Sequence, residues 1–257
     1  MSNQFKAIAV KNIPKINKGD DLTETFLNAL SKSKLNLKDQ DILVIAHKVF
    51  SKSEGQIVLL TSIKPSREAN KYAKDLKKDA RKVEVILKES KRVIKAFKRK
   101  DQNEGVMICE HRLGYISANA GVDESNNEIA DSVLTLPKNP DASAKKLQRE
   151  IYNRTGVTVG IVITDTFGRP WRLGQVNVAV GLAGVPATVK EMGNYDAWGY
   201  ELKVTEPAFA DELAAASGLI MKKAGKTPLI LIRGLKWEFK NSKASDIIRL
   251  EREDVFR

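Results

Sequence analysis

Residues 157–164 constrain the fold most, because this segment is almost wholly apolar and rich in β-branched side chains. Such a run predicts an interior strand that is covered on both faces of its sheet. Asp165 and Thr166 follow directly, so we expect them at the carboxyl end of the strand, where α/β proteins often bind ligands. A carboxylate beside a hydroxyl suits a hard divalent cation. The pattern predicts an active-site loop after this strand.

Two arginines come next, since Arg169 and Arg172 flank Pro170 and Trp171. Proline fixes its own φ and we expect Trp171 to pack inward, which would display both arginines on a stiff turn. Guanidinium groups bind phosphate or carboxylate oxygens in pairs, and this favours an anion-binding role. The chemistry alone allows an equally good alternative, in which Asp165 caps a turn and both arginines are ordinary surface residues.

The composition excludes several classes of protein. A chain of 257 residues can bury a sizeable core in one domain or two. Cys109 is the one cysteine, so no intramolecular disulfide forms, and we expect Cys109 in the core and the protein in the cytoplasm. Two histidines without a Cys-x-x-Cys motif argue against an ordinary zinc site. The sequence resembles no signal peptide and has no apolar stretch of membrane-spanning length, so we expect no membrane partner.

The net charge of +12 is concentrated in residues 71–100, which hold 13 Lys or Arg against 4 Asp or Glu. The apolar positions of this segment, from Tyr72 to Ile94 and Phe97, recur at helical spacing and predict one or two basic amphipathic helices. Their basic face is either a solvated surface or a positive rim that concentrates anionic ligands. The segment has few aromatic residues for stacking bases, so we expect no nucleic-acid partner.

Helices and strands alternate along the rest of the chain. Residues 41–46 predict a strand, and the preceding helix has Leu22, Phe26, Leu27 and Leu30 on one face. This alternation alone favours a plain α/β sheet. Residues 48–55 follow the strand with two lysines, two serines and Glu54, which form either a phosphate-binding segment or a polar turn.

Residues 115–127 hold a second carboxylate. Small residues, among them Ala120 and Gly121, let the backbone approach a ligand closely, and Asp123 and Ser125 supply oxygens. An Asx-rich helix cap is at least as good an interpretation on local grounds. Two separate oxygen-rich segments in a basic protein, one with Asp123 and one with Asp165, nevertheless favour magnesium or manganese handling a phosphate.

Near the carboxyl terminus, Thr205 is expected to cap a helix with Pro207 in its first turn. The helix should end within residues 221–225, and residues 228–233 predict another buried strand. The lysines at the helix end form either a phosphate-facing turn or the more common interaction with the last helical carbonyls.

Several motifs together identify a family, and the two that carry Asp residues are the most specific. They are residues 12–14 with 19–22, residues 51–55, residues 118–126, residues 164–172, residues 210–213 and residues 252–256. The combination resembles the coenzyme F-420-0:γ-glutamyl ligase family, and the likeness runs nearly end to end.

This resemblance implies a GTP-dependent ligase that adds L-glutamate to the coenzyme F-420-0 precursor through an acyl phosphate, with release of GDP and phosphate. Mn²⁺ or Mg²⁺ and K⁺ accompany the family's reaction. The number of glutamates added stays open. Two alternatives remain: a related nucleotide-dependent amide ligase with a different acceptor carboxylate, because no motif reads the deazaflavin ring, and a noncatalytic basic nucleic-acid-binding protein.

The resemblance also implies roles for individual residues. Asp123, Asp165 and Thr166 would hold the metal, and Arg169, Arg172 and Glu54 would be catalytic. The residues expected to bind GTP are Lys11, Asn12, Ile13, Pro14, His47, Lys48, Lys52, Asn126, Met221, Lys222, Lys223, Ala224, Gly225, Lys226, Thr227 and Pro228. The chain has Lys222-Lys223 where the family commonly has a metal-binding glutamine, and a protonated lysine cannot ligate a metal. The second metal site is therefore left open.

The fold implied by the resemblance is an α+β arrangement of two domains with mixed sheets, in an intertwined homodimer. On this basis we place a discontinuous nucleotide-binding domain at residues 1–71 plus 186–257. Residues 72–185 would form a second domain that carries the metal-site aspartates.

Overall fold

The computed structural model describes residues 4–125, 129–222 and 225–254. The fold is α+β with several sheets, as the resemblance implies, and differs from the plain α/β sheet that the alternation of elements favours. The difference arises because most neighbouring strands pair antiparallel, which a plain βαβ succession does not produce.

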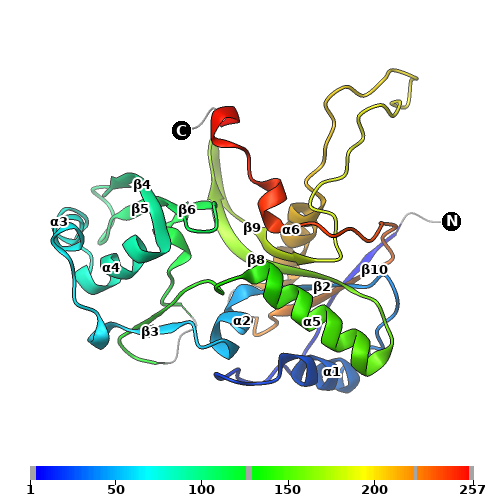
Figure 1. The fold of residues 1–257 in the computed structure, drawn as a ribbon, viewed down its shortest axis with the longest axis horizontal. Helices are drawn as coiled ribbons and strands as arrows, with labels where there is room; N and C mark the ends of the chain where they lie inside the picture. The colour runs from blue at the N-terminus through cyan, green and yellow to red at the C-terminus, as the bar shows by residue number, and fades with distance from the viewer. Residues whose placement is uncertain (1–3, 126–128, 223–224, 255–257) are drawn as a thin grey trace.

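A five-stranded sheet forms the centre of the molecule, in the order β1-β10-β2-β8-β9 (Figure 1). Its strands are β1 (Lys6–Ala9), β10 (Leu229–Arg233), β2 (Ile42–Ala46), β8 (Gly160–Arg169) and β9 (Arg172–Ala183). β2 and β8 run parallel, and the other neighbours run antiparallel. All three predicted strands are therefore present in one sheet.

Helices cover both faces of this sheet. On one face, α1 (Leu22–Lys32), α2 (His47–Ser53) and α5 (Pro140–Thr155) pack against the same core cluster as alternate residues of β2 and β8. On the other face, α6 (Phe209–Met221) packs against the remaining residues of β2 and β8, which alternate with those of the first face. β2 and the first half of β8 are consequently buried on both sides, which confirms the prediction of an interior strand.

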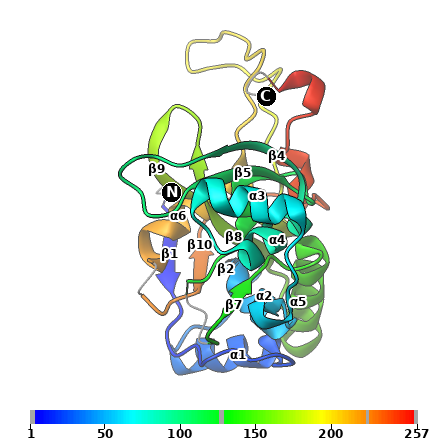
Figure 2. The same cartoon turned by 90° about the vertical axis from the view of Figure 1, so that its left-hand side faces the viewer.

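Two smaller sheets and two basic helices lie beside the central sheet (Figure 2). The elements are β3 (Ile57–Leu59) with β7 (Ser132–Leu134), β4 (Ser90–Phe97) with β5 (Val106–His111) and β6 (Ile116–Ala118), α3 (Arg67–Leu76) and α4 (Ala80–Glu89). Short 3-10 helices are η1 (Leu60–Ser62), η2 (Asn119–Gly121), η3 (Ala244–Ile247) and η4 (Glu251–Glu253). These helices and sheets share a third core cluster, which includes Cys109 as predicted.

Three local predictions are wrong. Ile94 and Phe97 belong to the strand β4, because the β-sheet pairing with β5 overrides their helix-like spacing. α6 begins at Phe209 with Ala208 as its cap, so Thr205 caps no helix. Asp165 and Thr166 lie within β8 and not after it, because β8 continues to Arg169 by pairing with β9.

The predicted division into domains stays a prediction. The central sheet combines β8 and β9, which fall in the predicted second domain, with three strands of the predicted first domain. In the described part of the chain, no helix has the length and apolar character needed to cross a membrane.

Candidate functional site

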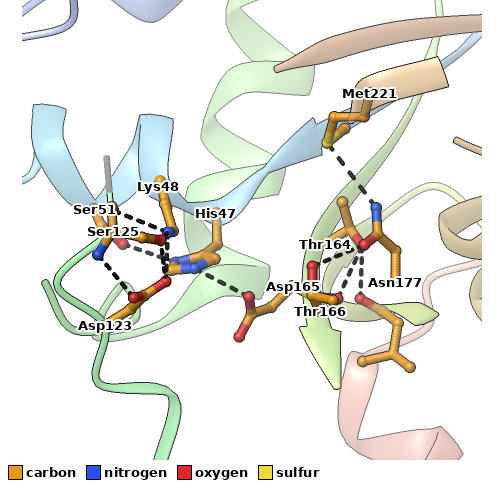
Figure 3. Close-up of polar contacts among 11 residues, drawn as sticks. His47, Lys48, Ser51, Asp123, Ser125, Thr164, Asp165, Thr166, Asn177 and Met221 are labelled. Carbon is orange, nitrogen blue, oxygen red and sulfur yellow. Dashed lines mark hydrogen bonds and ion pairs between the residues drawn. The ribbon is translucent and has the colours of Figure 1, made fainter. Parts of the chain in front are cut away.

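A pocket of about 1320 Å³ opens where β2 ends and α2 begins. Its walls include the first turn of α2, the second half of β8, the facing part of β9, the end of α6, and β6 with η2. The pocket therefore collects side chains from segments that are far apart in the sequence, including both of the predicted oxygen-rich segments (Figure 3).

The parallel pairing of β2 and β8 places His47 beside Asp165. Ala46 and Thr164 are partners in the register, so the residue that follows each of them enters the pocket at the same level. The Nε2 atom of His47 lies 3.3 Å from Oδ1 of Asp165. Burial alone would raise the pKa of Asp165, but His47, the backbone N–H of Thr166 and the charge of Lys48 together hold that pKa below its usual value. Asp165 is therefore a carboxylate.

His47 is buried and oriented by α2. Its Nδ1 lies 3.2 Å from the hydroxyl of Ser51, one helical turn later. Its Nε2 contacts Asp165 but makes no hydrogen bond of good geometry. One nitrogen is thus held by the protein, while the other faces the carboxylate side of the pocket.

Asp123 forms the second acidic position, and its partner is Lys48. The Nζ atom of Lys48 lies 2.5 Å from Oδ2 of Asp123 and also donates to the hydroxyl of Ser125 at 2.6 Å. The backbone N–H and the hydroxyl of Ser125 donate to Asp123 as well. Burial opposes ionisation of Asp123, yet Lys48 and Ser125 outweigh it and lower the pKa to about 2. Among the described residues Asp123 caps no α-helix, and the other residues of the alternative helix cap, Asn126 and Asn127, lie outside the described residues.

Gly121 allows this segment to pass close to Asp165. Its φ is +67°, and a Cβ at this position would lie 2.5 Å from Cδ1 of Leu136 and 3.8 Å from Oδ2 of Asp165. A larger residue would need a strained backbone and would displace Leu136. Gly121 thus lets the backbone pass close to Asp165, while the predicted close approach to a ligand stays a prediction.

Thr166 lies opposite a residue that sequence reasoning did not assign. The hydroxyl of Thr166 donates to Oδ1 of Asn177 at 2.9 Å, and both residues line the pocket. Asn177 is partnered with Thr166 across the β8–β9 hairpin. A regular hairpin that turns at Pro170 and Trp171 would pair Thr166 with Gln175, so no sequence signal pointed to Asn177. A register shift between Gly168 and Arg169 places Asn177 there instead.

The residues present suit both a divalent ion and a polyphosphate. In the described parts of the chain, no three His, Cys, Asp or Glu side chains converge on a metal position. A metal at Asp123, Asp165 and Thr166 would therefore take further oxygens from its substrate, as Mg²⁺ commonly does. Of the three buried side-chain polar atoms without a hydrogen-bond partner in the described chain, two line this pocket: Nε2 of His47 and Oγ of Ser117. Nε2 of His47 has only its contact with Asp165, so both groups leave hydrogen-bonding capacity for a polar ligand.

The pocket unites most of the residues predicted to bind GTP or metal. Those that line it are Ile13, Pro14, His47, Lys48, Lys52, Asp123, Asp165, Thr166, Met221, Lys222, Lys226, Thr227 and Pro228. Lys11, Asn12, Glu54, Gly225, Arg169 and Arg172 are not among its lining residues. Asn126, Lys223 and Ala224 lie outside the described residues.

Two of the residues outside the pocket have other contacts. Asn12 lines a smaller neighbouring cavity of about 240 Å³ that shares Pro14 with the main pocket. Glu54 accepts a short hydrogen bond from the hydroxyl of Ser143 on α5.

At the end of α6, the carbonyl of Met221 accepts from the hydroxyl of Thr227 at 3.0 Å, while Lys222 and Lys226 line the pocket.

Arg169 and Arg172 lie at the tip of the β8–β9 hairpin. Trp171, between them, is 88% exposed and has φ +62°, so the prediction that it packs inward is wrong. The reason is that β8 and β9 extend beyond the core and carry the turn out with them. Gly168, directly before Arg169, lines the pocket, whereas the two arginines do not.

Comparison with known proteins identifies the family. A family model described as F420-0:Gamma-glutamyl ligase matches residues 11–234. The coenzyme F420:L-glutamate ligase of Methanocaldococcus jannaschii is 44% identical over 222 residues, which cover 86% of each chain. The enzymes of the same name from Methanopyrus kandleri and Methanothermobacter thermautotrophicus are 42% and 40% identical, and the matches cover 95% and 97% of this chain and 94% and 98% of theirs. The chain therefore belongs to the F420-0:γ-glutamyl ligase family.

Proposed function

We propose that the protein is a GTP-dependent ligase that joins L-glutamate to the coenzyme F-420-0 precursor. The observation that carries the proposal is that one pocket combines the carboxylates of Asp123 and Asp165 with a set of lysines. The lysines are Lys15, Lys48, Lys52, Lys222 and Lys226. Carboxylates attract a divalent ion and lysines attract phosphates, so the pocket matches a metal-bound nucleoside triphosphate. Membership in the family supports the ligase activity.

The proposed chemistry has two steps. The γ-phosphoryl group of GTP passes to an oxygen of the acceptor carboxylate, which gives an acyl phosphate and GDP. The amine of L-glutamate then attacks the acyl carbon: the C–N bond forms, the C–O bond to phosphate breaks, and the amine loses its proton. The pocket would hold both anionic substrates and the nucleotide in one place, so that each step becomes intramolecular.

The roles of the residues follow from their positions. Asp123, Asp165 and Thr166 would hold Mn²⁺ or Mg²⁺, which neutralises charge on the transferred phosphoryl oxygens. The pocket lysines would bind the phosphates, with His47 keeping Asp165 in place. The family resemblance adds K⁺ to the reaction. Lys48 already contacts Asp123, so it would bridge the metal side and the phosphate side of the pocket.

The assay that tests this function uses the purified protein with Mn²⁺, K⁺, L-glutamate and the coenzyme precursor, and supplies either GTP or ATP. We expect mass spectrometry to show the precursor extended by glutamate, with one GDP released per bond, and turnover at least about tenfold faster with GTP. Equal turnover with both nucleotides would contradict the GTP assignment. No extended product with either nucleotide would contradict the ligase proposal.

Asp165→Asn should abolish metal-dependent turnover and leave the fold intact. A neutral amide offsets less of the charge of a divalent ion, and the same change removes the charge that faces His47. Turnover should fall by about a hundredfold or more at limiting Mn²⁺. Asp101→Asn, at an exposed position, is the matched control and should behave like the unmodified protein. If Asp165→Asn stays within a few-fold of that control, Asp165 holds no metal.

We propose that Arg169 and Arg172 bind an acceptor carboxylate at the pocket rim. Arg169→Lys and Arg172→Lys keep the charge but remove the planar guanidinium. Losing one charge-assisted bond of about 1.5–3 kcal/mol predicts a ten- to hundredfold rise in the KM of the acceptor. The KM of GTP is the internal control and should not change. Acceptor KM values that match the unmodified protein in both variants would make the two arginines ordinary surface residues.

We also propose that the chain forms a homodimer through an arm of residues 188–206. This segment projects from the body of the molecule near α6 (Figure 1), and it exposes Tyr195, Trp198 and Tyr200 by 71%, 86% and 73%. Its tip is nevertheless ordered, because the carboxylate of Asp196 accepts hydrogen bonds from the backbone N–H groups of Trp198 and Tyr200. A grouped set of exposed aromatic side chains is typical of a protein interface.

Light scattering measures the mass of the protein in solution and therefore tests the proposed homodimer. We expect the mass of two chains for the unmodified protein, and a shift toward one chain for Trp198→Ser, because the change removes the largest apolar surface of the arm. Trp171→Ser, on the hairpin, controls for loss of an exposed tryptophan elsewhere. A monomeric mass for the unmodified protein would overturn the proposal.

A further inference from the structure

β9 carries a β-bulge directly beside the acidic wall of the pocket. Ile163 is partnered with Gly181, but the next residue of β8, Thr164, is partnered with Ala179. Val180 is therefore an extra residue on β9, and the two strands change register by one position at this point. The change occurs one residue before Asp165.

The bulge and a second register shift, between Gly168 and Arg169, together decide which side chains meet in the pocket. Beyond the bulge, Thr166 is partnered with Asn177, and their side chains are hydrogen-bonded at 2.9 Å. In the register that holds before the bulge, Thr166 would instead be partnered with Val178. An apolar side chain would then replace the amide of Asn177 opposite the hydroxyl of Thr166.

Side chains from other elements hold the bulge. β9 is an edge strand, so part of its backbone needs partners other than a strand. Asp211 on α6 accepts from the N–H of Ala179 at 2.8 Å, and the hydroxyl of Tyr115 donates to the carbonyl of Val180 at 2.7 Å. Farther along β9, the N–H of Leu182 donates to Asp141 on α5 at 2.8 Å.

Tyr115 links the bulge to the wall of the pocket. Its ring packs edge-on against Phe167, with 6.0 Å between the ring centres, and Phe167 lines the pocket. Burial raises the pKa of the Tyr115 hydroxyl, and Asp141 and Asp211 raise it further, so the hydroxyl stays a donor. Gly181, the residue after the bulge on β9, lets the strand pass close to Pro140, because a Cβ at this position would lie 2.6 Å from Cβ of Pro140.

We propose that Tyr115 and Asp211 are positioning residues that hold the Val180 bulge and thereby keep Asn177 beside Thr166 in the pocket. Neither residue lines the pocket, so both act through β9. The activity arm of the test rests on the proposed ligase function, whereas the structural arm does not.

The structural arm measures amide hydrogen exchange in Asp211→Ala and Tyr115→Phe. Each variant removes one contact to the bulge, and Tyr115→Phe keeps the ring that packs on Phe167. We expect exchange at Ala179 and Asn177 to accelerate by about tenfold, while amides of β2 stay unchanged. Glu212→Ala and Tyr152→Phe are the matched controls, since Glu212 is the exposed neighbour of Asp211 in the same first helical turn and Tyr152 is an exposed tyrosine on α5. Unchanged exchange at Ala179 and Asn177 would overturn the proposal.

The activity arm separates positioning from a general loss of stability. We expect kcat to fall about tenfold in Tyr115→Phe and Asp211→Ala, while the Kd of GTP changes less than about twofold, because none of the pocket lysines lies on β9. In an Asn177→Ala background, the same changes should have almost no further effect on kcat. Equal kcat losses with and without Asn177 would overturn the proposal. If the unmodified protein turns over no substrate, the ligase proposal fails and the exchange rates alone decide the role of the bulge.

Discussion

The parallel pairing of β2 with β8 is the interaction on which the site depends. It is the one parallel neighbour relation in the described central sheet, and it brings the carboxyl end of β2 level with the middle of β8. His47 and Asp165 meet only because Ala46 and Thr164 share that register. Both strands are apolar on both faces, so their register is fixed by two core clusters at once. The burial of these strands is therefore what gives the polar pocket its geometry.

Neighbouring cations and hydrogen-bond donors determine the ionisation of the two acidic residues in the pocket. Burial alone would favour the neutral form of Asp165 and Asp123, yet both have lowered pKa values because cations and N–H donors face them. Lys48 contributes to both, as a direct partner of Asp123 and as a nearby charge for Asp165. The pocket consequently contains ionised groups of both signs within reach of one ligand, which is the environment that a metal-bound phosphate requires.

Local chemistry in the sequence predicted much of the site but not its framework. Asp123 and Asp165 line one pocket, as two oxygen-rich segments in a basic protein led us to expect. Asn177 was not assigned because its partner depends on strand register, which changes twice along the hairpin, once between Gly168 and Arg169 and once at Val180. Trp171 is exposed although tryptophan usually packs inward, since the hairpin extends past the core that would cover it. Ile94 and Phe97 have helical spacing but pair in β4, where tertiary contacts outweigh local pattern.

The contacts of the two acidic residues also bear on how the protein exists without its ligands. Lys48 neutralises Asp123, and His47 with Lys48 faces Asp165, so neither carboxylate needs a bound metal to offset its charge. Proteins whose folding is coupled to a metal unfold when a chelator removes the ion. Under the proposed function, the chain would complete its fold first and then take up a divalent ion together with its phosphate substrate. If the proposed metal were scarce, the protein would then lose activity without exposing its core to proteases or aggregation.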